Sequence, residues 1–271
     1  MKKEEEVSLK LSKDENFYKL TNKELAIKYD CSKATIDRAI KLSKLKKNKS
    51  IIGSLKKYSE KKKPELHISK ELDEIITGSM LGDGYIKDYI KHTSGPERRR
   101  NRNSSLVLKH GYKQEEYIMY KKNMIDNHVF SYIRKQNITD VRFKNPLYTQ
   151  YIVETSQNYA FNKYRDLWYV DGKKIIPFNK LIITPLILAI WFQDDGFKTS
   201  SSYILSTNGF NKNEVEKLSN LLNYTYGLST YIRHQSNNQY IIIIPAKDIS
   251  NFNDIILPYI HESMLYKIIF K

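Results

Sequence analysis

Two aspartates, each followed by a glycine at the end of an apolar run, are the side chains of this 271-residue sequence best suited to chemistry. Asp83 closes the run 76–84 and Asp195 closes the run 186–196. A helix C-terminus carries roughly half a negative charge, so a carboxylate there is disfavoured by about 0.3–1 kcal/mol. If the two helices pack in parallel, both acids meet at their ends and form an oxygen site suited to a hard divalent cation such as Mg²⁺. Either aspartate alone would be better explained as a solvated turn residue, and it is the matched pair with its flanking residues that favours the metal site.

The residues around the two runs predict where each helix begins and ends. Thr184 is suited to cap a helix that starts at Pro185. Gly84 and Gly196 favour helix termination, because glycine tolerates the left-handed conformation past a helix C-terminus. Gly78 and Gly82, four residues apart, give the first helix a face of small residues for close packing.

The second helix has no such face. Ile190 and Asp194 stand at the places that match the two glycines. This puts in question how tight and how symmetric the seam is, that is, the contact between the two helices. By its position, Asp194 is expected to be the non-catalytic neighbour of Asp195. Gln193 is near enough to orient a water, although no other feature supports that role.

Aligned on their final Asp-Gly, the two runs resemble the two motifs of a monomeric LAGLIDADG homing endonuclease. The resemblance covers residues 66 to 271, and it includes the segments Lys173–Pro177 and Pro258–Lys267. It implies an α+β fold, a pseudo-twofold pair of αββαββα halves that offer antiparallel sheets to DNA. It also implies that Asp83 and Asp195 bind the metal and that Lys174 and Lys267 act on the reacting phosphate. For the lysines, a phosphate-positioning or merely solvated role stays open, and Lys173 is the neighbouring alternative to Lys174.

Hydrophobic periodicity and turn residues predict the order of elements in both halves. Half 1 is expected over 66–168, an inter-half linker over 169–183 and half 2 over 184–271. The predicted helices are 72–81, 114–129, 158–168, 184–194, 212–226 and 247–257. The predicted strands are 85–89, 105–110, 141–143, 148–154, two within 199–207, and a hairpin of 229–235 with 239–245 that turns at Asn237-Asn238.

The strands supply the side chains that we expect to contact DNA. Arginine and lysine can pair with guanine edges, and glutamine can pair with adenine. Arginines in a long basic loop are expected to contact phosphates or to lie in a solvated loop. The strand residues are Tyr85, Lys87, Tyr89, Lys109, Arg142, Lys144, Lys198, Tyr203, Arg233, His234 and Gln239; the loop residues are Arg98, Arg99, Arg100 and Arg102.

The N-terminal region is expected to be a separate module. Residues 1–12 are charged and expected to fray, and residues 14–45 predict short helices that resemble a helix-turn-helix, so the module is placed at 1–45 and a basic linker at 46–65. Lys33, Thr35 and Arg38 lie on the face that would enter a major groove. The alternative is a helical hairpin that only shields part of the main domain.

The charge balance points to a polyanion. The chain carries 46 Lys+Arg and 30 Asp+Glu, a net charge of +16, and residues 1–70 hold 20 basic and 10 acidic side chains, or +10. A single cysteine, Cys31, excludes an internal disulfide framework. No membrane span or secretion signal is expected. We therefore expect a reducing intracellular compartment, either the cytoplasm of a bacterial or phage-infected cell or an organelle matrix.

Three functions compete for this sequence. The leading one is a Mg²⁺-dependent endonuclease that cuts double-stranded DNA at a long site and acts as a monomer. A non-cleaving DNA-binding regulator of the same fold is the second, and the presence of both acids argues against it. An RNA maturase that assists intron splicing, with intron RNA as partner, is the third.

Overall fold

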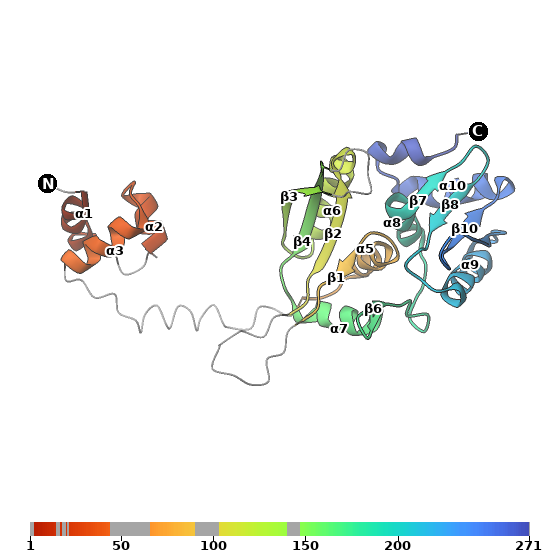
Figure 1. The fold of residues 1–271 in the computed structure, drawn as a ribbon, viewed down its shortest axis with the longest axis horizontal. Coiled ribbons are helices and arrows are strands. Elements are labelled where there is room, and N and C mark those ends of the chain that lie inside the picture. The colour runs from red at the N-terminus through yellow and green to blue at the C-terminus, as the bar shows by residue number, and fades with distance from the viewer. Residues whose placement is uncertain are drawn as a thin grey trace. The chain divides into compact units, whose positions relative to one another are not determined.

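A computed structural model describes residues 3–14, 17, 20, 22–43, 66–89, 103–139 and 147–270 (Figure 1). The chain divides into two compact units, Met1–Pro64 and Glu65–Lys271. Of the predicted DNA contacts, Arg98, Arg99, Arg100, Arg102, Arg142 and Lys144 lie outside the described residues.

The described part of the N-terminal unit contains three helices, α1 (Lys3–Ser12), α2 (Asn22–Lys28) and α3 (Lys33–Leu42). Ser32 caps α3 by accepting a hydrogen bond from the Thr35 backbone N–H. The expectation that residues 1–12 fray was wrong for residues 3–12, which form α1. Val7 and Leu11, four residues apart on one face of α1, are buried in the same core as Ile36 and so hold that helix in place.

The larger unit is built from one sequence of elements that occurs twice, and the predicted pseudo-twofold α+β fold is confirmed. A short hairpin of β5 (Tyr169–Val170) and β6 (Lys173–Lys174) connects the two halves. Half 1 consists of α5 (Lys70–Leu81), β1 (Tyr85–Ile86), β2 (Leu106–Gly111), α6 (Glu115–Asp126), β3 (Ser131–Thr139), β4 (Leu147–Thr155) and α7 (Tyr159–Trp168). Half 2 consists of α8 (Pro185–Asp195), β7 (Gly196–Lys198), β8 (Tyr203–Ser206), α9 (Lys212–Tyr226), β9 (Tyr231–His234), β10 (Tyr240–Ile244) and α10 (Ile249–Ile256).

Short 3₁₀ turns join several of these elements, at Tyr112–Gln114, Ala246–Asp248, Leu257–Tyr259 and Glu262–Lys267. Within the described residues, no helix is long and apolar enough to cross a membrane.

The two sheets have the same strand order, which is the structural basis of the repeat. Half 1 forms an antiparallel sheet in the order β1-β2-β4-β3, and half 2 forms one in the order β7-β8-β10-β9. The helices α5 and α8 lie side by side between the two sheets (Figure 1). One continuous hydrophobic core, which includes Ile76, Trp168 and Trp191, surrounds these two helices and holds both sheets against them.

Local sequence signals explain several elements of half 2. Thr184 caps α8, as predicted, and Pro185 is its first residue. At α9, Asn211 and Glu214 form a capping box, and Gly227 ends the helix in the left-handed conformation with φ +64°. Asn237 and Asn238 have φ of 58° and 57°, so the predicted turn between β9 and β10 is confirmed.

The prediction for the second strand pair of half 1 was partly wrong. The partner of β4 is β3, Ser131–Thr139, which pairs with it from Ser131↔Thr155 to Thr139↔Leu147. The predicted strand 141–143 lies outside the described residues. Most of β3 is exposed, and only Ser131 among its residues is buried, so its sequence lacks the apolar alternation by which a half-buried strand is recognised.

Candidate active site at the ends of two parallel helices

The helices α5 and α8 run in the same direction, so that their C-termini meet. Gly78 faces Ile190 and Gly82 faces Asp194. A Cβ added at Gly78 would lie 2.8 Å from the Ile190 Cβ, and one added at Gly82 would lie 2.5 Å from the Asp194 Cβ. Both distances are below van der Waals contact, so the seam is tight although only α5 supplies glycines.

Asp83 and Asp195 follow this contact directly, one from each half. Burial raises the pKa of Asp83 to about 6, and the nearby carboxylate of Asp194 adds to that effect. Burial likewise raises the pKa of Asp195 to about 7, and the carboxylates of Asp83 and Asp194 contribute. The structure therefore brings the two predicted metal ligands close enough to repel each other, at helix ends that are themselves negative.

A cation fits this set of donors. The side chain of Asp83 is 42% exposed, which leaves it accessible to a ligand. Among the described residues, no group of three or more His, Cys, Asp or Glu side chains could hold a metal ion, so the protein offers two carboxylates rather than a closed cage. An open oxygen site of this kind suits Mg²⁺, which retains waters and takes phosphate oxygens as further ligands.

Lys174 and Lys267 each bind the backbone at the end of one motif helix. The Lys174 Nζ donates to the carbonyl oxygens of Met80 (2.8 Å), Gly82 (3.3 Å) and Gly84 (2.7 Å). Because an ammonium group has three donors, Lys174 has committed all of them to the end of α5. Burial lowers the pKa of Lys174 to about 8, against the opposing effect of the nearby carboxylates.

The contacts of Lys267 at the end of α8 are fewer. Its Nζ donates to the carbonyl oxygens of Gln193 (2.6 Å) and Asp194 (3.3 Å), which are the contacts found for it within the described residues. Lys267 is buried, and burial lowers its pKa. Two of its three donors are thus used, so Lys267 differs from Lys174 in having one N–H to offer to a substrate.

A buried polar network lies behind Asp83, and sequence reasoning missed it. The Lys121 Nζ lies 2.9 and 2.8 Å from the two carboxylate oxygens of Asp194, and the Tyr117 hydroxyl donates to Asp194 at 2.8 Å. His110 lies 3.6 Å from Asp194 and 3.7 Å from Asp83. The one available signal was a lysine within the apolar stripe of α6, four residues after Tyr117. The side chain of Asp194 is fully buried and is held by these groups, so Asp194 is a structural acid.

Gln193 also proves to be structural. Its side-chain amide donates to the carbonyl oxygens of Ala189 and Tyr259, and its side-chain oxygen accepts from the His261 backbone N–H at 2.8 Å. It is fully buried and ties α8 to the C-terminal segment. Its contacts are therefore structural, and they do not support the predicted role of orienting a water.

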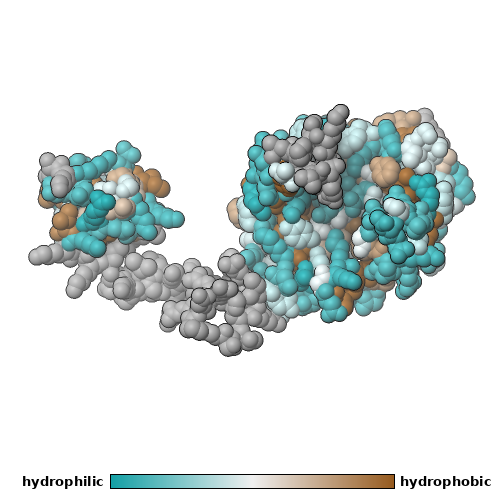
Figure 2. Space-filling view, in the orientation of Figure 1, coloured by the Kyte–Doolittle hydropathy of each residue, from teal (hydrophilic) through white to brown (hydrophobic). Residues whose placement is uncertain are grey.

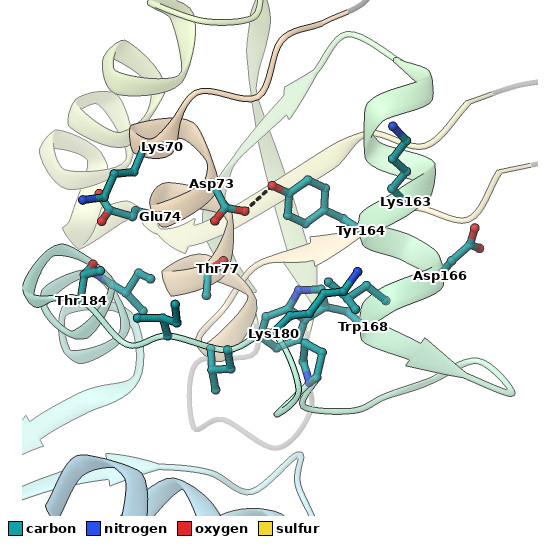
Figure 3. A pocket seen from close by; sticks show the side chains of 15 residues that line it. Lys70, Asp73, Glu74, Thr77, Lys163, Tyr164, Asp166, Trp168, Lys180 and Thr184 are labelled. Carbon is teal, nitrogen blue, oxygen red and sulfur yellow. Dashed lines mark hydrogen bonds between the residues drawn. The ribbon is translucent and has the colours of Figure 1, made fainter. Parts of the chain in front are cut away.

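Two hollows adjoin the paired helices, at opposite ends. The one beside the acids has a volume of about 370 Å³ and is lined by residues that include Gly82, Lys174, Asp195 and Thr207. The larger one, of about 820 Å³, lies at the helix N-termini, and Figure 3 shows Lys70, Asp73 and Thr184 around it. None of the predicted site residues lines the larger hollow, which places the candidate chemistry at the C-terminal end.

Several side chains predicted to contact DNA have partners within the protein. Lys87 forms an ion pair of 2.6 Å with the buried Glu154, and the Lys198 Nζ donates to the Ile268 carbonyl oxygen. Lys109 lies over the ring of Tyr85 at 5.0 Å. Tyr203 is fully buried and bonds Asn253, so its prediction as a base-reading residue was wrong.

Several of the remaining predicted contacts that lie within the described residues are accessible. Arg233 and His234 are exposed on β9, and Gln239 is partly buried where that hairpin turns. In the N-terminal unit Lys33 and Arg38 are exposed and Thr35 is partly buried. Hydrophilic residues cover most of the face of the larger unit that is visible in Figure 2. Contact of these residues with DNA stays a prediction.

Comparisons with known proteins agree with the geometry. A model of the "LAGLIDADG DNA endonuclease family" matches residues 73–252. The probable intron-encoded endonuclease 1 of Wickerhamomyces canadensis is 33% identical over 223 residues, which are 78% of this chain and 89% of the relative. The cytochrome b mRNA maturase bI2 of Debaryomyces hansenii is 28% identical over 205 residues, 74% of each chain. The solved structure of the homing endonuclease I-WcaI bound to its DNA recognition sequence matches with a TM-score of 0.64 and 31% identity, over 85% of this chain and 97% of that one.

Proposed function

Because the chain belongs to the LAGLIDADG DNA endonuclease family, we propose that it cuts both strands of a specific DNA duplex with the help of Mg²⁺. The observation that carries the proposal is the pair of carboxylates, Asp83 and Asp195, at the adjoining ends of two parallel helices. Both halves belong to one chain, so the protein is proposed to act as a monomer. The similarity to a DNA-bound homing endonuclease supports duplex DNA as the substrate.

The chemistry requires a water made nucleophilic and a phosphate whose growing charge is neutralised. A bound Mg²⁺ would supply both, since such an ion lowers the pKa of a bound water and stabilises the attacking and leaving oxygens. Asp83 and Asp195 are the residues that would hold it. The tight seam fixes the spacing of the two acids, because neither helix can move toward or away from the other without disturbing this packing.

The two lysines have separate parts in this proposal. Lys174 locks the chain from Met80 to Gly84, and with it the backbone of Asp83, through three hydrogen bonds. Its charge acts on the site at a distance, since it has no donor left for substrate. Lys267 holds the end of α8 with two donors and directs positive charge and its third N–H to the reacting phosphate.

The decisive experiment must first find a target, because the sequence does not specify one. A library of randomised duplexes is selected on the immobilised protein in Ca²⁺, which accepts looser geometry than Mg²⁺ and so favours binding without cutting. The selected duplex is then incubated with the protein in Mg²⁺, and the ends are mapped on both strands. Defined breaks in both strands are expected.

The matched variants are Asp83→Asn and Asp195→Asn, which keep the shape of each side chain and remove its charge. Each should abolish double-strand cleavage and leave binding of the selected duplex in Ca²⁺ largely unchanged. If either variant cuts at nearly the wild-type rate, the assignment of the metal ligands is wrong. Tight binding by the wild type without any cleavage in Mg²⁺ would instead favour the non-cleaving regulator.

A maturase is the second candidate, and a relative named as a cytochrome b mRNA maturase supports it. The described surface does not distinguish duplex DNA from structured RNA as the charged partner. Competition between the selected duplex and a folded intron transcript for the full-length protein separates the two. Tighter binding to the transcript, together with faster splicing of it, would favour the maturase.

A further inference from the structure

In the buried network behind Asp83, side chains of half 1 bind a carboxylate of half 2 across the contact between the two motif helices. Asp194 belongs to α8 of half 2, yet the side chains that hold its carboxylate come from half 1: Tyr117 and Lys121 of α6. His110 of β2, also in half 1, lies 3.6 Å from it. The side chains of Lys121 and Asp194 are both inaccessible to solvent. Such a pair is stable only while both partners are present, because either one alone would be a buried unpaired charge.

The described residues of half 2 form no matching network. The residue of α5 that corresponds to Asp194 is Gly82, which has no side chain to send across the seam. The helix of half 2 that repeats α6 is α9, and its buried residues are Val215, Leu218, Ser219 and Leu222, none of them charged. The two halves therefore share a fold but differ in what lies behind their acids.

The network reaches Asp83 by two routes. His110 lies between the two acids, 3.6 Å from Asp194 and 3.7 Å from Asp83, so a shift of Asp194 changes the surroundings of Asp83 directly. The backbone offers the second route, since the Asp194 side chain packs against Gly82, the residue that precedes Asp83. A displacement of Asp194 would thus move Asp83 through the chain.

We infer that Tyr117 and Lys121 are positioning residues that hold Asp194 and through it set the place of Asp83, which makes the two cleavage centres inequivalent. The inference rests on the proposed function. Its consequence is that weakening the network changes the cutting rate of one DNA strand more than that of the other, because the described residues of half 2 form no matching network.

The test measures single-turnover cutting of each strand of the selected duplex in Mg²⁺, with the two strands carrying different labels. Tyr117→Phe removes one hydrogen bond to Asp194 and keeps the ring in place. The double variant Lys121→Met with Asp194→Asn removes both buried charges together, so it avoids the unpaired charge that could unfold a single variant. The control is Lys122→Met, which alters the next lysine of α6, whose side chain pairs with Asp126 near the surface.

In the double variant the ratio of the two strand rates should shift about tenfold or more, because misplacing a reacting group by an ångström can cost on the order of 100-fold in rate. Tyr117→Phe should shift the ratio in the same direction by a smaller factor, and Lys122→Met should leave it unchanged. A merely structural role would reduce the active fraction and slow both strands equally. A ratio unchanged in both test variants overturns the inference, whereas a wild type that cuts neither strand overturns the proposed function and the inference with it.

Discussion

Substituting Gly78 by alanine tests the tightness of the seam between the two motif helices. The added Cβ would lie 2.8 Å from the Ile190 Cβ and 2.9 Å from the Ile187 carbonyl oxygen. Ordinary van der Waals contact begins at 3.4 Å, so the helices must part by about 0.6 Å, the difference between 3.4 and 2.8 Å. Neither neighbour can give way alone, because one is backbone and the other is a β-branched side chain with a stiff χ1.

Two effects on the free energy of unfolding oppose each other. Replacing glycine by alanine inside a helix stabilises it by about 1 kcal/mol. Forcing an extra methyl group into a closely packed interface costs about 1–3 kcal/mol. Because both close neighbours are rigid, the cost should lie toward the upper end, and we expect net destabilisation of about 1–2 kcal/mol.

The assay is urea unfolding followed by tryptophan fluorescence. The chain has 2 tryptophans, and Trp168 and Trp191 are both buried in the larger unit, so the signal reports on that unit alone. Gly111→Ala is the matched control. A Cβ there would meet no atom within 4 Å, and the φ of −65° suits alanine. Its stability should stay within about 0.5 kcal/mol of the wild type.

Cutting of the selected duplex gives an independent readout. Separation of the helices by about 0.6 Å moves Asp83 away from Asp195, and a misplacement of that order should slow single-turnover cutting roughly tenfold. A Gly78→Ala protein that equals or exceeds the wild type in stability and cuts at the same rate would refute the close approach of α5 and α8.

Three further predictions concern the site and the N-terminal unit. Lys267→Met should slow cutting more than it weakens duplex binding. Lys174→Met should also lower the urea midpoint, since it leaves three carbonyl oxygens without a donor. Equal effects of the two variants on cutting and on the urea midpoint would contradict their separate roles. Protons compete with the cation for Asp83 and Asp195, whose pKa values are raised to about 6 and about 7, so the Mg²⁺ concentration for half-maximal cutting should rise as pH falls from about 8 to about 6. A requirement independent of pH in this range would mean that neither acid binds the cation. A chain that begins at residue 66 lacks 19 basic and 10 acidic side chains, and it should still fold and cut while protecting a shorter stretch of DNA. Its plot of log affinity against log salt should be flatter by about 0.9 for each phosphate that the N-terminal unit neutralises in the full-length protein. An unchanged footprint and salt slope would show that residues 14–45 do not touch DNA.

The sequence by itself determined the helices of the larger unit, the repeat and the candidate acids of this protein, whereas helix α1 was not expected. Helix caps such as Thr184 and the left-handed position Gly227 are set by residues within one turn of each other. Such a preference does not decide every case, because Gly196 ends α8 with a φ of −87° and not in the left-handed conformation expected for it. The two Asp-Gly ends also stand out without a structure, because a carboxylate at a helix C-terminus opposes the helix dipole and so requires an explanation.

Only the tertiary structure decided which polar groups support those acids. Lys121 and Asp194 are 73 residues apart, and nothing local to either predicts a buried pair, since the partner of a buried charge is chosen by the packing of distant elements. The same applies to Lys174, whose place in the sequence predicted a role at the phosphate, while its three bonds to the end of α5 became visible only in the fold. The strand β3 was hidden for a related reason: it is held by backbone hydrogen bonds to β4, and these leave no pattern in an exposed sequence.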